Sequence, residues 1–226
     1  MTVTTRRERR QQQRRQEARR SGGSGGGGGS RGIGQIWIVA GVIVAVVALV
    51  LAARAAGVFD APATDGTIDI NSPAYDVAGA TIGTHQDEIG KSHVPTGQKV
   101  AYPSLPPTSG DHWAQPAAPA PWGIKTAVLP FEVSTHNLEH GGIVILYAAD
   151  LTTPQVDQLR SLVRQLQTAG FAKIVLEPWP DMPKDSKVIL TAWNWIMKLP
   201  GIDAVSIVKF TKAHHASPES PEPTVP

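Results

Sequence analysis

The longest apolar run of the chain lies near its N-terminus. Residues 36–53 read IWIVAGVIVAVVALVLAA, eighteen residues without a charged or strongly polar side chain. At about 1.5 Å of rise per residue, a helix of this length, extended by its flanks, crosses a hydrocarbon core of roughly 30 Å. We therefore predict a transmembrane helix over residues 33–54, with Trp37 near the membrane interface.

Two other interpretations of this run are weaker. A buried core helix would need a polar face, which the run does not have. One feature supports a cleaved signal peptide: Ala53-Arg54-Ala55 matches the small-x-small cleavage pattern. The run is, however, longer than the roughly 7–15 residues of a signal core. An uncleaved anchor is the favoured interpretation.

The last third of the chain carries clear strand patterns. Continuous apolar runs predict three strands, over residues 141–149, 171–179 and 187–193. A final helix is predicted over residues 203–213. Because a helix is expected between the first two strands, these should be parallel if they share a sheet.

The helix between the first two strands has recognisable ends. Apolar residues recur at helical spacing from Val156 to Leu166 and form one face. Thr153 is suited to cap this helix and Pro154 to begin it, while Gly170 is suited to end it.

The segment before these elements is rich in proline and glycine. Residues 72–135 predict mainly loops, with short strands near residues 100–102. The predicted fold class is α+β, in which a loop-rich exported domain has a small mixed sheet and two packed helices. The predicted parts are a cytoplasmic Arg/Gly-rich tail (1–32), a transmembrane helix (33–54), a linker (55–71), an exported domain (72–213) and a disordered tail (214–226).

Charge sets the expected orientation of the chain. Residues 1–32 contain nine arginines and two glutamates, a net charge of +7, whereas residues 55–226 carry −6. The positive-inside rule places the N-terminus in the cytoplasm, so we expect a single-pass protein of the cell membrane with an extracytoplasmic domain. An acidic domain argues against nucleic acid as a partner and leaves the lipid bilayer as the expected one. The absence of cysteine excludes disulfides and thiolate metal sites.

The histidines are the candidate functional residues of this domain. His136 and His140 are four residues apart, which on a helical turn places both imidazoles on one face, within reach of a single metal ion. His93 and His112 lie in tight loops that could bring two further ligands to that ion. His214 and His215 follow the last predicted helix, and we expect them to be solvated.

Acidic residues near these histidines have two possible roles. Asp111 or Glu139 could bind the ion or accept a hydrogen bond from an imidazole. Residues 136–140 also match the H-x-x-E-H pattern of inverted zinc peptidases, but a strand-like run follows at once where that class continues a long helix.

Several motifs in the chain resemble one known family. The motifs are HVP (93–95), Tyr102 followed by PPTSG-x-H (106–112), PWG (121–123), HNLEHGGIVILY (136–147) and LTAW (190–193). This combination is similar to the bacterial domain-of-unknown-function family numbered 3105. The resemblance implies a membrane-anchored, exported domain and carries over four recurrent histidines, at positions 93, 112, 136 and 140. It supplies no settled activity.

The sequence thus predicts a membrane-anchored extracytoplasmic domain that binds copper or zinc through His93, His112, His136 and His140. Met182 is a further possible ligand if the ion is Cu(I). The alternatives are a non-catalytic envelope or interaction module with structural histidines, and a metal-dependent hydrolase with Glu139 as base. An enzymatic role is the less favoured of these interpretations.

Overall fold

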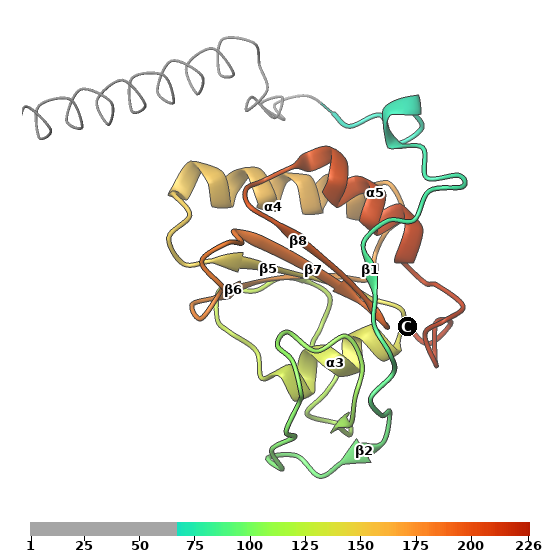
Figure 1. The fold of residues 1–226 in the computed structure, drawn as a ribbon, viewed down its shortest axis with the longest axis vertical. Helices are drawn as coiled ribbons and strands as arrows, with labels where there is room; N and C mark the ends of the chain where they lie inside the picture. Colours follow the sequence, from blue (N-terminus) through green and yellow to red (C-terminus); the bar gives the residue numbers. More distant parts are fainter. Residues whose placement is uncertain (1–66) are drawn as a thin grey trace, which may run out of the picture. The chain divides into compact units, whose positions relative to one another are not determined.

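The structure, a computed structural model, describes residues 67–226 as a mixed α+β domain (Figure 1). Its main sheet has six strands in the order β1-β8-β7-β5-β6-β4. These strands are β1 (Thr84–His85), β4 (Gly123–Ile124), β5 (Ile143–Ala148), β6 (Ile174–Trp179), β7 (Val188–Ala192) and β8 (Trp195–Leu199). The predicted transmembrane segment, 33–54, lies outside the described residues. Within residues 67–226, no helix has the length and apolar character needed to cross a membrane.

The centre of the sheet matches the sequence pattern closely. The three predicted strands are β5, β6 and β7, and every residue of β5 and β7 is buried. β5 and β6 are parallel, as the helix between them required, whereas β7 runs antiparallel to β5. The pattern missed β8, which pairs antiparallel with β7, and the two-residue strands at the sheet edges.

Two helices cover one face of the sheet (Figure 1). α4 (Thr153–Thr168) begins after Thr152, whose side chain forms a capping box with Gln155, so the cap lies one residue earlier than predicted. α5 (Ala204–His214) is capped by the side chain of Asp203. The apolar faces of both helices pack on the sheet in the larger hydrophobic core. A short 3-10 helix, η1 (Pro73–Tyr75), precedes β1.

The opposite face of the sheet carries a third helix, α3 (Phe131–Glu139) (Figure 1). The prediction of two packed helices is therefore wrong, because only a helical turn was expected here. Eight of the nine residues of α3 are buried, although most of them are polar. A helix enclosed on all sides has no solvent-facing stripe, so the periodicity that reveals α4 is absent. Leu138 anchors α3 to the smaller core on this face.

Residues 90–125 wrap around α3 and are tied to its polar side chains. The amide of buried Asn137 accepts a hydrogen bond from the backbone N–H of Ala120 (3.0 Å) and donates one to its carbonyl (2.8 Å). Glu132 accepts the N–H of Val100 at 3.1 Å. The short strands predicted near residues 100–102 are absent. This part of the chain has instead a two-stranded parallel sheet of β2 (His93–Val94) and β3 (His112–Trp113).

The last residues of the chain pack against the end of α3, where the sequence predicted a disordered tail. The N–H of Glu222 donates to the carbonyl of Glu139 at 3.0 Å, and Ala216 donates to Gly141 at 2.8 Å. Lys173 donates from its ammonium group to the carbonyls of Pro223 and Val225. These contacts use backbone groups, which a composition rich in proline does not reveal.

Candidate metal centre

The β2/β3 pair brings two histidines from distant loops side by side. His93 and His112 are direct partners in this parallel register, and their ring centroids lie 4.8 Å apart. The ladder continues on either side of the pair, from Gly110 N–H to Gly90 carbonyl and from Ala114 N–H to Val94 carbonyl. Opposed residues in a sheet project to the same face, so the register alone aims both imidazoles in one direction.

α3 supplies the other face of the cluster. His136 and Glu139 lie one turn apart on this helix, and His140 is its C-cap residue, whose N–H donates to the carbonyl of His136. The predicted helical geometry of the His136 and His140 pair is therefore confirmed. Their Nε2 atoms lie 3.2 Å apart. Glu139 points to the same side because residues three apart on a helix share a face.

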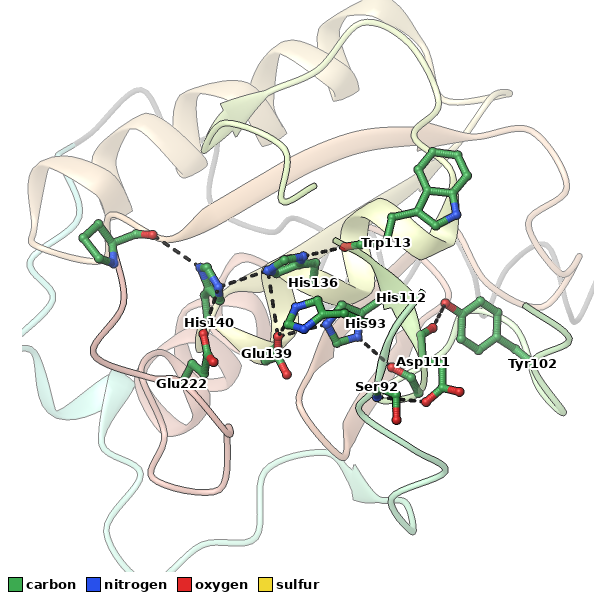
Figure 2. A network of polar contacts seen from close by, with 12 residues as sticks. Ser92, His93, Tyr102, Asp111, His112, Trp113, His136, Glu139, His140 and Glu222 are labelled. Atoms are coloured by element: carbon green, nitrogen blue, oxygen red, sulfur yellow. Dashed lines mark hydrogen bonds and ion pairs between the residues drawn. The ribbon is translucent and has the colours of Figure 1, made fainter. Parts of the chain in front are cut away.

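The side chains converge on one carboxylate oxygen (Figure 2). Oε2 of Glu139 lies 2.9 Å from Nε2 of His112, 3.4 Å from Nε2 of His93 and 3.8 Å from Nε2 of His136. One atom of each of these four residues forms a group in which all separations are within 4.8 Å. His140 belongs to a second such group with Glu139 and Glu222, whose Oε2 lies 3.3 Å from its Nε2.

Hydrogen bonds fix how two of the imidazoles present their nitrogens. Nδ1 of His112 lies 2.8 Å from the carbonyl of Gly110, and Nδ1 of His136 lies 2.7 Å from the carbonyl of Trp113. A carbonyl only accepts, so Nδ1 carries the proton in both rings. Nε2 of each ring is then the metal-binding atom, in the pattern common to histidine ligands in proteins.

The electrostatics of His136 and Glu139 match this assignment, whereas those of His112 favour the protonated ring, in which Nε2 donates to Glu139. Burial is the main influence on His136 and lowers its pKa to about 4, with the neighbouring rings of His112 and His140 acting in the same direction. Burial also lowers the pKa of His112, but its hydrogen bonds to Glu139 and to the Gly110 carbonyl outweigh burial and raise it. Burial raises the pKa of Glu139, whereas the histidines around it lower the pKa more strongly. His136 is thus neutral, and Glu139 is an ionised carboxylate.

The separations in the cluster fit a small transition-metal ion. Two ligands at about 2.0–2.1 Å from a tetrahedral zinc ion lie roughly 3.3 Å from each other. The separations measured from Glu139 to the three histidines of its group, 2.9 to 3.8 Å, bracket this value. In the first group only His93 is not buried, with a side chain that is 43% exposed, and in the second group the side chain of Glu222 is 45% exposed. His93 borders an open pocket of about 360 Å³ that is also lined by His136, His140 and Glu222.

The structure gathers the predicted ligands and adds Glu222. The four predicted histidines all lie in or beside the cluster, as does Glu139, which the sequence predicts as a ligand or a hydrogen-bond acceptor and which is placed for both roles. Glu222 was missed, because nothing in the sequence places it beside His140. Asp111 lies elsewhere, since its Oδ1 accepts the N–H of Ser92 at 2.9 Å and holds β2 to β3.

Three other residues differ from expectation. Met182 packs against the smaller hydrophobic core, not against the histidines. The expectation that His214 and His215 are solvated is wrong. His214 is buried and stacks on Trp195, while Nε2 of His215 accepts the N–H of Lys173. The predicted last helix ends at His214 and continues one residue further than its apolar pattern.

The fold and the site define an α+β domain with a histidine–glutamate cluster that borders an open pocket. The chain belongs to the family described as "Protein of unknown function (DUF3105)", whose model matches residues 93–226. This range begins at His93 and includes all four predicted histidines. No curated protein and no solved structure matches the chain.

Proposed function

We propose that this domain binds a transition-metal ion, copper or zinc, through His93, His112 and His136 together with Glu139. The observation that carries the proposal is the convergence of three imidazole nitrogens on one buried carboxylate oxygen. Three nitrogen donors and one oxygen donor suit zinc or Cu(II), and the chain has no cysteine to favour a softer ion. The exposed edge of His93 leaves the ion accessible from the pocket.

A purely structural role for the histidines would use some of the same contacts. The bonds from Nδ1 of His112 and His136 hold loop carbonyls in place whether or not an ion is bound. A structural role also explains why Nε2 of His112 lies 2.9 Å from Glu139, but it does not require Nε2 of His93 and of His136 to approach the same oxygen. Nor does the geometry favour a hydrolase with Glu139 as base, because its Oε2 lies between His93 and His112 as a ligand would.

The substitution His136→Asn separates the metal from the structural role. The amide nitrogen of asparagine takes the place of Nδ1 and keeps the donor to the Trp113 carbonyl, but Nε2 is lost. We expect the purified full-length parent to contain bound metal, and the variant to fold normally and lose most of it. His85→Asn, which changes an exposed histidine of β1, is the matched control and should keep the metal.

Two measurements decide the outcome. Elemental analysis after growth with added zinc and copper gives the metal content, and thermal melting with and without a chelator reports its effect on stability. A bound ion raises the melting temperature because it binds the folded state alone. A parent that contains no metal, with a melting temperature that neither ion changes, would leave the structural role as the explanation.

We also propose that residues 33–54 anchor the domain to the cell membrane and that the domain lies outside the cytoplasm. This proposal is supported by the eighteen-residue apolar run and by the positive charge that precedes it. Taken together, the two proposals describe a domain that is held at the outer side of the lipid bilayer and binds a metal ion there.

A further inference from the structure

We infer that the cluster holds two metal ions rather than one, and that Glu222 binds the second ion together with His140. This inference rests on the proposed function. The potential ligand atoms fall into two groups, and Glu139 belongs to both. His93, His112 and His136 complete the first group, and His140 and Glu222 complete the second. Glu139 has two carboxylate oxygens and is placed to bridge the two ions.

The atoms around His140 are placed to bind a cation. Nε2 of His140 lies 3.2 Å from Nε2 of His136 and 3.3 Å from Oε2 of Glu222. His136 carries its proton on Nδ1, which faces the Trp113 carbonyl, so its Nε2 presents a lone pair. A carboxylate oxygen also presents only lone pairs. When His140 carries its proton on Nδ1, which lies 3.4 Å from the Pro226 carbonyl, its Nε2 presents a third lone pair. The three lone pairs then repel one another, and a positive ion among them removes the repulsion.

The backbone position of Glu222 is fixed by the chain around it, and its side chain is 45% exposed beside His140. Its N–H donates to the carbonyl of Glu139, so its backbone is joined to the end of α3. Lys173 donates to the carbonyl of His140 and to those of Pro223 and Val225, which joins the tail to the same helix end. Gly141 has a positive φ of 76°, and a Cβ there would lie 2.9 Å from Cα of Ala216. This close packing shows that the tail is packed in a defined position beside the cluster.

One alternative explains the same contacts without a second ion. The proton of His140, if carried on Nε2 in place of Nδ1, would let this ring donate to Glu222 or to His136. The cluster would then hold a single ion. The two explanations differ in the number of metal ions that the chain binds and in what Glu222 contributes.

Metal stoichiometry of the full-length chain tests the inference. The probe is Zn²⁺, added in excess and followed by removal of free ion. We expect two ions per chain in the parent and one in Glu222→Gln, which keeps the size and the backbone contacts of Glu222 but weakens its binding to a cation. Glu219→Gln changes an acid of the same tail outside the cluster and should retain two ions.

Cu²⁺ gives a second readout. Two ions that share a carboxylate are about 3.5–4 Å apart, so their unpaired electrons couple, and electron paramagnetic resonance of the copper-loaded parent should show this coupling. Glu222→Gln should show an isolated Cu²⁺ signal. One ion per chain in both parent and variant would overturn the inference and leave the proposed function standing. A parent without metal would overturn both.

Discussion

Glu177 of β6 is a buried carboxyl group whose ionisation opposes folding. The N–H of Leu129 donates to its Oε2 at 2.6 Å, whereas its Oε1 has no hydrogen-bond partner among the described residues. Burial raises the pKa of this group from 4.5 to about 7, against the weaker effects of the Leu129 hydrogen bond and of Lys125. Between pH 4.5 and 7 the folded state therefore binds more protons than the unfolded state, so stability falls as pH rises through this window.

The substitution Glu177→Gln should remove this pH-dependent loss of stability. At pH 8 the variant should be more stable than the parent by an amount on the order of 3 kcal/mol, because about 1.4 kcal/mol accompanies each unit of pKa shift. At pH 4.5 the difference should be small. Urea unfolding at the two pH values measures it, with Asp181→Asn, an exposed acid after the same strand, as the control. A difference between Glu177→Gln and the parent that does not change with pH would show that Glu177 ionises normally.

The residues of the site differ in how far the sequence could predict them. The spacing of His136 and His140 was sufficient to predict a shared face, since it depends only on helix geometry. His93 and His112 could be named as candidates, but their partnership depends on the β2/β3 register, which no local pattern encodes. Glu222 could not be found at all, because its place depends on backbone hydrogen bonds of the tail.

At the scale of elements, the turn from α3 into β5 is the tightest junction near the site. A Cβ on Gly142 would lie 2.5 Å from the Trp122 ring and 2.6 Å from the carbonyl oxygen of Asn137. The N–H of Gly142 donates to that same carbonyl, which fixes the backbone on both sides of the contact. The junction therefore determines how α3, with its three ligand residues, meets the sheet.

Gly142→Ala should destabilise the domain by about 3 kcal/mol, the upper part of the range for overpacked sites, because a backbone carbonyl cannot move aside as a side chain can. The measurement is the midpoint of urea unfolding. Gly201→Ala is the matched control, since a Cβ there meets nothing within 4 Å and φ is not positive, so its midpoint should change little. Equal effects of the two substitutions would contradict a steric role for Gly142.

The elements differ in how far their sequences predict them. β5, β6 and β7 carry continuous apolar runs because both faces of each strand are covered, and α4 carries one apolar stripe because its other face meets solvent. α3 is enclosed by the sheet on one side and by loops that bond its polar side chains on the others, so neither pattern appears in its sequence. The loops follow the positions of other elements and have no periodicity of their own.

At the scale of the whole molecule, the proposed anchor makes a testable claim about orientation. The chain has no cysteine, so Ser104→Cys introduces a single thiol at an exposed position of the domain. We expect a membrane-impermeant maleimide to label it in intact cells, because the positive charge of residues 1–32 keeps the N-terminus inside. A thiol placed at Ser24 is the control and should be labelled only after lysis. The reverse pattern would show that the domain faces the cytoplasm.

Lys173 affects how fast an ion bound by Glu222 would dissociate. Its ammonium group joins the tail to the end of α3 through three carbonyls, and the same tail carries Glu222. An ion bound by Glu222 leaves when this segment lifts away, so the residence time follows the opening rate of the segment as well as the strength of the coordinate bonds. Two chelators of different affinity, each in large excess, would then remove that ion at one common limiting rate.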